Sequence, residues 1–265
     1  MLNPNAYQVP LRYSADIYPE RVQTGRSTWT DWKLIPTSRL SVNPPEPKYN
    51  FIDVPGTSRE IDLTDAVAGH VNYGPRTGSW EFVIVDPDVV WYELYSEIME
   101  FIQGKRCRVV LRPDMDYYYE GRLYVNEFKS NPDNSTIVID YHFGPFKYDY
   151  NDDLDQLENW ITQLNYIDNQ QTQAEFELEA GGASHTLDVD VFAPTVPRFV
   201  ISGGPVQLLV SSDNWQGVGT YTIPTGGDYT NENIVMMNGP GSLTFYVESG
   251  DANASVEVRF ANGHL

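Results

Sequence analysis

The second half of the sequence is a series of short apolar runs separated by turn residues, and this pattern constrains the fold most. The runs are AEFELEA, HTLDVDVF, RFVIS, VQLLV, GTYTI, NIVMM, LTFYVE and ASVEVRF, with Gly, Pro or Asn between them. Apolar and polar residues alternate within them, as in strands that bury one face. Short strands at a spacing of about 8 to 12 residues are typical of a β-sandwich. We therefore expect an all-β sandwich over residues 185–265 and no helix after residue 170.

The first half predicts one helix that covers a half-buried sheet. Apolar residues in WYELYSEIMEFIQGK recur at helical spacing, with Asp86-Pro87 or Asp88 as the expected start and Gly104 as the expected end. The strand-like runs RCRVVLR, YYYEGRLYVNEF and STIVIDYHF follow. Before Gly56 the chain is rich in turn residues, which indicates an extended arm with at most short strands. The predicted fold class is mainly β with one clear α-helix.

Charge is distributed unevenly along the chain. The net charge is −20 and the isoelectric point is about 4.3, so neither nucleic acid nor an anionic membrane is an expected binding partner. Residues 1–150 hold 21 acidic and 15 basic side chains, whereas residues 151–265 hold 16 acidic and 2 basic ones and no lysine. This shift predicts two domains with a boundary near residue 150. Residues 151–184 are then an acidic linker or the first strands of the second domain.

Neither the apolar runs nor the cysteine content indicates a membrane or secreted protein. No apolar run approaches the roughly 20 residues that span a bilayer, and the first residues lack the basic and apolar parts of an export signal. Cys107 is the single cysteine, so no internal disulfide is possible. We expect it to be a small residue within a strand.

A glycine-rich connector precedes the run SWEFVIV and raises the question of a phosphate-binding loop. Such loops follow a strand and open a helix, but here the connector leads into a strand and lacks the Gly-Lys-Ser/Thr ending. Nucleotide binding is therefore not expected. Gly74, Pro75 and Gly78 are interpreted as turn-shaping residues that aim the following strand.

The acidic motif DYNDDLD resembles the start of a calcium-binding loop. Asp149, Asn151 and Asp153 occupy alternating positions, as such a loop requires. Leu154, however, stands where the loop needs glycine, and Trp160 stands where it needs a bidentate glutamate. A solvated acidic linker is the better interpretation, and no metal is expected.

Catalytic residues cannot be nominated from the sequence. Asp188 and Asp190 share one strand face and could supply two metal ligands, but the solvent-facing side of a sandwich strand is the more frequent reason for this pattern. The histidines have no metal-ligand spacing, and no nucleophile can be paired with a base. We expect no enzyme activity and no cofactor. A glycan hydrolase remains an alternative that requires two convergent carboxylates.

One loop of the second half has a composition suited to carbohydrate. In SSDNWQGVGTY, Trp215 follows Asp213 and Asn214, and an aromatic ring beside polar groups can stack on a sugar. The alternative is that Trp215 closes one end of its own sandwich. Asp213, Asn214 and Trp215 are therefore candidate carbohydrate contacts.

Several ordered motifs of residues 28–150 resemble the N-terminal domain of phage and prophage distal tail proteins. They are DWKLIPTSR, VPGTSREIDLTDAVAG, YGPRTGSWEFVI, WYELYSEIMEFIQGKRCRVVL, YYYEGRLYVNEFKS and IVIDYHFGPFKYD. More loosely, TVPRFVIS and the final ASVEVRFANGHL resemble the C-terminal β-sandwich that many of these proteins carry, a galectin-like or carbohydrate-module-like domain.

The resemblance implies a structural virion protein of a long-tailed bacteriophage. In that family a β-sandwich-like first domain assembles through sheet and arm contacts into a hexameric ring that joins the tail tube to the tail tip or baseplate and lets DNA pass. The implied partners are other copies of the chain, the tail tube protein and a tail-tip, tail-associated or receptor-binding protein. The implied location is the virion tail, assembled in the host cytoplasm. A carbohydrate-binding module that contacts the host envelope through the C-terminal sandwich is the alternative function.

Overall fold

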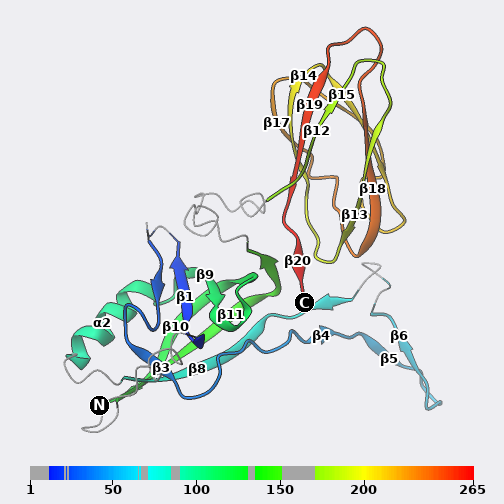
Figure 1. The fold of residues 1–265 in the computed structure, drawn as a ribbon. Coiled ribbons are helices and arrows are strands. Elements are labelled where there is room, and N and C mark those ends of the chain that lie inside the picture. Colours follow the sequence, from blue (N-terminus) through cyan, green and yellow to red (C-terminus); the bar gives the residue numbers. More distant parts are fainter. Residues whose placement is uncertain are drawn as a thin grey trace. The chain divides into compact units, whose positions relative to one another are not determined.

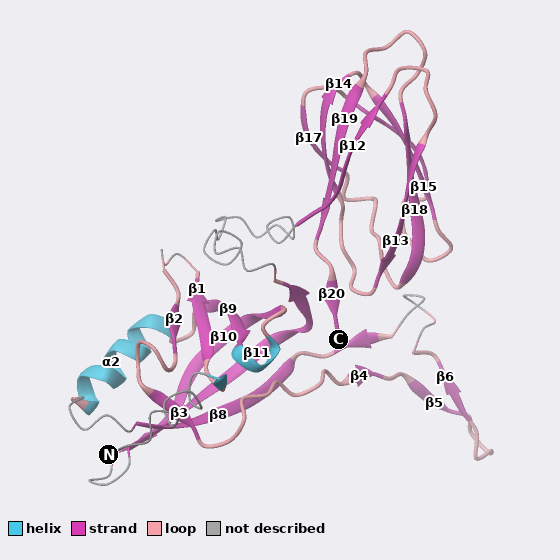
Figure 2. Cartoon of the chain, viewed as in Figure 1, coloured by secondary structure: helices cyan, strands magenta, loops and turns pink. Residues whose placement is uncertain are grey.

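The computed structural model describes residues 12–20, 22, 24–64, 66, 71–84, 90–130, 135–150 and 171–265 of the chain. The chain divides into two compact units, residues 1–162 with Leu265 and residues 163–264. Strands dominate both units (Figures 1 and 2). Each unit has its own hydrophobic core, and we describe them in turn.

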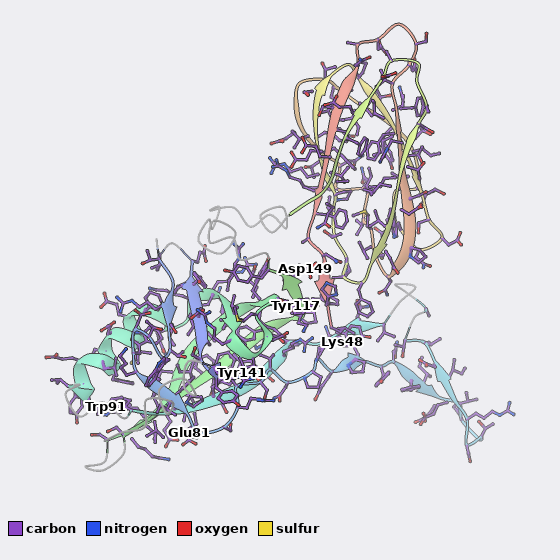
Figure 3. The ribbon with its side chains drawn as sticks, viewed as in Figure 1. Lys48, Glu81, Trp91, Tyr117, Tyr141 and Asp149 are labelled. Carbon is purple, nitrogen blue, oxygen red and sulfur yellow. The ribbon has the colours of Figure 1, made fainter. Side chains whose placement is uncertain are left out.

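The first unit is built on one antiparallel sheet with the order β2-β1-β9-β10-β11-β8-β3. Its strands are β1 (Ala15–Pro19), β2 (Arg26–Ser27), β3 (Leu34–Pro36), β8 (Arg76–Ile84), β9 (Arg106–Leu111), β10 (Tyr117–Lys129) and β11 (Ser135–Asp149). A short 3₁₀ turn, η2 (Arg112–Asp114), connects β9 to β10. Alternate residues of the long strands enter the core, among them Tyr141 of β11 (Figure 3).

Helix α2 (Trp91–Ile102) covers the core face of this sheet. Its buried residues Leu94, Ile98 and Ile102 recur at helical spacing and join the same cluster as the sheet residues. The expected capping residues 86–88 lie outside the described part of the chain, and Gly104 has a left-handed φ of 67° just after the helix. No helix among the described residues is long and apolar enough to cross a membrane.

The chain before Gly56 differs from the extended arm that its turn-rich sequence indicated. Strand β1 pairs with β9, so it is an internal strand of the main sheet. Ile17, Trp32 and Leu34 are buried in the core. Removing the first 50 residues would therefore destroy the first unit as well as shorten an arm.

A pair of thin two-stranded ladders extends the first unit beyond its main sheet. Strands β4 (Pro47–Lys48) and β7 (Asn72–Tyr73) form one ladder, and β5 (Phe51–Asp53) and β6 (Glu60–Asp62) form the other. The second ladder is a hairpin whose turn includes Gly56 at a φ of 81°, a conformation that glycine adopts without strain.

The second unit is a β-sandwich of two four-stranded antiparallel sheets, with the orders β12-β19-β14-β17 and β13-β18-β15-β16. Its strands are β12 (Gln171–Leu178), β13 (His185–Val191), β14 (Arg198–Gly203), β15 (Val206–Ser211), β16 (Gly219–Ile223), β17 (Gly227–Thr230), β18 (Gly239–Tyr246) and β19 (Ala254–Phe260), followed by β20 (Gly263–His264). Strand β12 lies within residues 151–184, for which the sequence left open an acidic linker or the first strands of the second domain. The core lies between the sheets and includes Phe199, Phe245 and Val256.

The run NIVMM is the one expected strand of the sandwich that does not become one. Ile234 and Met236 are buried in the core, but the segment makes isolated bridges, Thr195 to Met236 and Gln216 to Val235. Strand β17 takes the sheet edge instead, beside β14. Apolar content alone does not distinguish a buried connection from a strand.

Candidate functional site

The β5–β6 hairpin carries apolar side chains that the first unit leaves exposed. Phe51, Ile52 and Ile61 are 51%, 49% and 50% exposed, and the adjacent Tyr49 is 64% exposed. Ile52 pairs directly with Ile61 across the hairpin. None of these side chains belongs to the core of the unit. An isolated two-stranded hairpin is at best marginally stable in water, so this element lacks a hydrophobic support of its own.

Backbone hydrogen bonds join the two chain segments that lead from the main sheet to the hairpin and back. The amide of Gly74 donates to the carbonyl of Glu46 at 2.7 Å, and the amide of Leu63 donates to the carbonyl of Asn50 at 2.8 Å. The amide of Asn50 also donates to Oγ1 of Thr64 at 3.1 Å. These bonds join the two sides of the extension on either side of the β4–β7 ladder. We call the described residues 46–64, 66 and 71–74, which include the hairpin, the arm.

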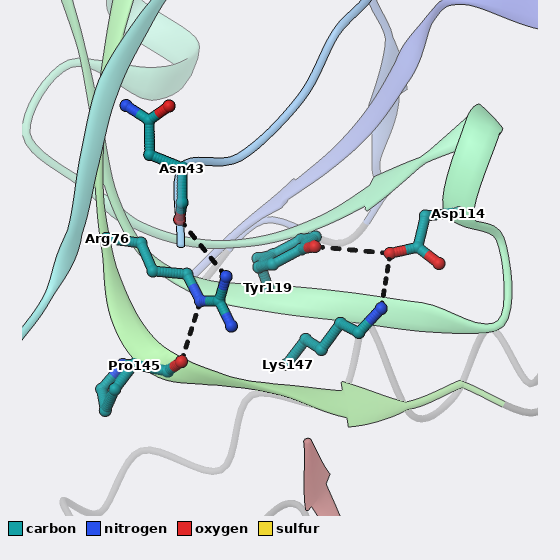
Figure 4. Close-up of polar contacts among 6 residues, drawn as sticks. All are labelled: Asn43, Arg76, Asp114, Tyr119, Pro145 and Lys147. Carbon is teal, nitrogen blue, oxygen red and sulfur yellow. Dashed lines mark hydrogen bonds and ion pairs between the residues drawn. The ribbon is translucent and has the colours of Figure 1, made fainter. Parts of the chain in front are cut away.

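A buried arginine fixes the base of the arm. Arg76 is only 5% exposed; its Nε donates to the carbonyl of Pro145 at 2.8 Å and its Nη1 to the carbonyl of Asn43 at 3.2 Å (Figure 4). The guanidinium lies 5.8 Å from the ring centre of Tyr119. Burial lowers the pKa of Arg76 from its ordinary value, and the nearby Tyr119 and Tyr141 oppose this shift only in part. The side chain ties β8 to β11 and to the segment that precedes the arm.

A second polar group lies beside this arginine. Oδ2 of Asp114 accepts a hydrogen bond from the Tyr119 hydroxyl at 3.3 Å and pairs with Nζ of Lys147 at 2.9 Å (Figure 4). Burial, together with the charge of Asp114, raises the pKa of Tyr119 to about 12. The phenol is therefore neutral at physiological pH. Its contact with Asp114, and that of Asp114 with Lys147, have a structural role.

Of the three residues interpreted as turn-shaping, Gly74 and Pro75 lie in the connection before β8, whereas Gly78 lies within the strand itself. Gly74 and Pro75 separate β7 from β8, while Gly78 lies inside β8 opposite Tyr141. Neither glycine has a left-handed φ. A Cβ added at Gly78 would lie 2.3 Å from the Tyr141 hydroxyl. That hydroxyl accepts the amide of Asn43 at 3.0 Å, so glycine is needed at position 78 because another side chain occupies the space.

The candidate carbohydrate loop is held mainly by contacts within the sandwich. Trp215 is 5% exposed, its Nε1 donates to the carbonyl of Gly239 at 3.2 Å, and its ring lies against Gly241. Asn214 donates through Nδ2 to the carbonyl of Asn238 at 3.0 Å, while Asp213 is exposed. A buried indole offers little face for a sugar, and carbohydrate contact at this loop stays a prediction.

Metal-ligating side chains do not cluster in the described part of the chain. No set of three or more His, Cys, Asp or Glu side chains is placed to hold a metal there. Asp188 and Asp190 line a groove of about 210 Å³ together with Gln173 and Asn262. Cys107 is fully buried, and burial raises its pKa to about 12. Of the calcium-like motif DYNDDLD, Asp149 and Tyr150 lie among the described residues, and the other five residues lie outside them.

The exposed apolar residues of the hairpin are the feature that the sequence interpretation missed. Tyr49, Phe51 and Ile52 were assigned to a turn-rich arm, without attention to their own chemistry. The stretch from Asn50 to Leu63 has short apolar runs on both sides of the Pro-Gly pair at residues 55 and 56, which is a hairpin signal. This signal does not indicate that both faces of the hairpin remain exposed.

No family model matches this sequence, and no curated protein matches it. Among solved structures, the crystal structure of the Dit protein of phage SPP1 is similar, with a TM-score of 0.56 and 9% sequence identity. The similarity covers 95% of this chain and 99% of that chain. That protein is described as a paradigm of the hub adsorption apparatus in phages that infect Gram-positive bacteria. At this identity the likeness establishes the fold, and it confirms the mainly β fold class with one clear helix.

Proposed function

We propose that this chain is a structural subunit of a phage tail. Copies of it form a closed hexameric ring that joins the tail tube to the tail tip or baseplate and lets DNA pass. The observation that carries the proposal is the arm, an extended two-stranded element whose apolar residues Phe51, Ile52 and Ile61 are half exposed. The fold shared with a phage hub protein supports the same assignment.

The arm has the chemistry of a subunit contact. Burying one large apolar side chain contributes about 1.5–3 kcal/mol, so docking the hairpin on a neighbouring copy supplies the support that the hairpin lacks. Such a contact joins two different surfaces of identical chains. A contact of that kind must close into a ring or continue as a filament, and a ring suits a tail of fixed width.

The net charge of −20 suits a ring through which DNA moves. Acidic surfaces repel phosphates, so no ion pairs need to break during transit. The proposed partners are further copies of the chain, the tail tube protein and a tail-tip or receptor-binding protein, and the proposed location is the virion tail. No enzyme activity forms part of the proposal. Carbohydrate contact at Asp213, Asn214 and Trp215 is a weaker second candidate, since the indole is buried.

Mass photometry of the purified chain, alone and with its tube and tip partners, tests the assignment. We expect a ring for the wild type and monomers for the double variant Ile52→Asp/Ile61→Asp, because two carboxylates cannot be buried at the contact. Tyr92→Asp is the matched control: Tyr92 is a strongly exposed aromatic residue on α2, outside the arm, and this variant keeps the ring. A wild-type chain that stays monomeric with both partners present contradicts the proposal.

A further inference from the structure

Strand β16 forms one edge of the second unit, and its outer side has no partner strand in the described chain. It pairs with β15 on one side and ends the sheet order β13-β18-β15-β16. Throughout residues 171–265, all of which the structure describes, no backbone hydrogen bond reaches Gly219–Ile223 from the other side. Alternate residues of an antiparallel strand point their N–H and C=O groups away from the partner, so about two or three residues of β16 present unpaired groups at this edge.

The sequence of this edge lacks the features that protect exposed strand edges. Proteins usually place charged residues, Pro or bulges at such edges. The three other edge strands of the sandwich carry carboxylates, namely Glu175 and Glu177 on β12, Asp188 and Asp190 on β13, and Asp228 on β17. Strand β16 reads GTYTI and contains neither a charged residue nor Pro, and its Thr, Tyr and Ile residues favour strands. The edge of β16 can therefore accept another strand.

Charge favours a second copy of the chain as the occupant of this edge. The second unit holds two basic residues, Arg198 and Arg259, and each pairs with a carboxylate of its own sheet. Two copies of this acidic unit therefore repel each other over most of their surface. In the sheet that contains β16, the charged residues are Asp188 and Asp190 on β13, which lies three strand spacings, or roughly 14 Å, from β16. Two copies thus approach with less repulsion at β16 than at the other three edges.

The strand is also complementary to itself. If two copies of β16 pair antiparallel about Tyr221, Thr220 of each copy lies opposite Thr222 of the other. Both threonines are exposed, and Thr–Thr pairs are favourable neighbours across strands. In the same register Val218, which is 53% exposed, lies opposite Pro224 of the second copy and adds an apolar contact.

We propose that β16 is a self-association edge, at which two copies of the chain join their four-stranded sheets into one continuous sheet. The contact is two-fold symmetric, so it joins copies in pairs and closes at two. It differs in this from the head-to-tail contact of the proposed ring, and it does not rest on that proposal. A single pair of short strands buries little surface, so the pairing is weak and requires concentrated protein.

Sedimentation equilibrium of the full chain at high concentration tests the proposal. The background is Ile52→Asp/Ile61→Asp, because this variant removes the arm contact and separates pairing at β16 from ring formation. We expect dimers that dissociate on dilution, so that the same variant is monomeric in the dilute samples of mass photometry. A synthetic peptide of residues 218–224, VGTYTIP, should compete for the edge and shift the equilibrium toward monomers, whereas a scrambled peptide should not.

Two variants at the same positions, made in this background, test the register. Thr220→Asp/Thr222→Asp places like charges opposite each other and should raise the dissociation constant about tenfold or more. Thr220→Lys/Thr222→Asp places Lys opposite Asp twice and should keep the dimer, with an affinity that falls as salt rises. Both variants lose the hydrogen bond of Thr222 to Gln207 alike, so their difference reports the cross-strand charges.

The control is Thr186→Asp on β13, an exposed position on the opposite edge strand of the same sheet, and this variant keeps the dimer. Circular dichroism must show all variants folded. The proposal is overturned if the arm variant stays monomeric at high concentration, if the two double variants at β16 dimerise equally, or if Thr186→Asp abolishes the dimer. A wild-type chain that forms this dimer but no ring with its tail partners contradicts the ring proposal alone.

Discussion

At the scale of single residues, a close contact with another side chain explains why position 78 is glycine. The sequence shows that Gly78 lies in a glycine-rich stretch, and a turn is the simplest local explanation. The actual reason is Tyr141 on the neighbouring strand, whose hydroxyl occupies the space that a Cβ would need. Such a contact joins residues far apart in the sequence, and no local pattern reveals it.

Gly78→Ala is expected to destabilise the first unit by about 1–3 kcal/mol, because the added methyl group overlaps the Tyr141 side chain. Gly74→Ala is the control: the nearest atom to its Cβ is the Glu46 carbonyl oxygen at 3.4 Å, an ordinary contact. That variant should change stability by no more than about 0.5 kcal/mol. Urea denaturation followed by circular dichroism measures both, and equal effects would refute the steric explanation.

Cys107 is expected to be unreactive toward thiol reagents in the folded protein. Burial raises the pKa of its thiol to about 12, so almost no thiolate exists at neutral pH, and the side chain is inaccessible. A chromogenic disulfide reagent should label it only after denaturant unfolds the first unit. Rapid labelling of the native chain would show that β9 opens locally.

Asp16 gives the first unit a pH dependence of known sign. Burial raises the pKa of its carboxyl above the ordinary value, and the nearby Arg112 opposes this only in part. The folded state thus holds the proton more tightly than the unfolded state. Stability from this residue is present below about pH 4 and is lost as pH rises through the raised pKa.

Asp16→Asn removes that titration. The free energy of unfolding of the variant, relative to the wild type, should therefore increase between pH 4 and neutral pH. Urea midpoints at several pH values measure it. A difference that is constant across this range would mean that the pKa of Asp16 is the same in both states.

At the scale of elements, the periodicity of apolar residues predicted the helix and those strands that bury one regular face. The helix at Trp91–Ile102 and the strands β9, β10 and β11 follow from apolar spacing, since each buries one regular face. Strand β1 was missed because Ala15–Pro19 is short and surrounded by turn residues, and only its pairing with β9 makes it a core strand. The hairpin of β5 and β6 was not predicted, because the turn-rich sequence before Gly56 does not show that Phe51 and Ile52 pair with a second strand and stay half exposed.

Replacing Phe51–Asp62 by a short Gly-Ser turn tests whether the hairpin is needed for ring formation and not for the stability of the first unit. No residue of the hairpin belongs to the core, so the thermal midpoint should change by less than a few degrees. Ring formation should be lost. Differential scanning calorimetry and mass photometry report the two properties, and a large fall in the midpoint would make the hairpin part of the unit's own fold.

At the scale of the whole molecule, the shift in composition along the chain predicts two domains. The loss of lysine and the change of net charge place a boundary near residue 150, and the compact units divide at residue 162. Strand β12 contributes to the sandwich although its sequence is as acidic as a linker, because its apolar residues Phe176 and Leu178 pack against the core. Polar residues on an outer strand and in a linker look alike in sequence.

Limited proteolysis should first cut between about residues 150 and 185, where polar residues join the two units. The fragment 171–265 should then remain folded, since it contains both sheets of the sandwich and their core. Mass spectrometry of the fragments and circular dichroism of the purified fragment check this. First cuts within β14 or β18 would contradict the division.

Chelation should leave the stability of the chain unchanged. The calcium-like motif lacks its glycine and its bidentate glutamate, and no group of metal ligands occurs in the described ranges. Calorimetry with and without EDTA compares the thermal midpoints. A large decrease with EDTA would reveal a site built from carboxylates far apart in the sequence.

The burial of Trp215 has an optical consequence. It is the sole tryptophan of residues 171–265, and its ring is enclosed by the sandwich and held by the Gly239 carbonyl. The second unit therefore carries one intrinsic fluorophore in an apolar environment, which should emit at shorter wavelength than an indole in water. In the fragment 171–265 every change of tryptophan emission reports on this one position, so the sandwich can be followed through unfolding without an attached dye.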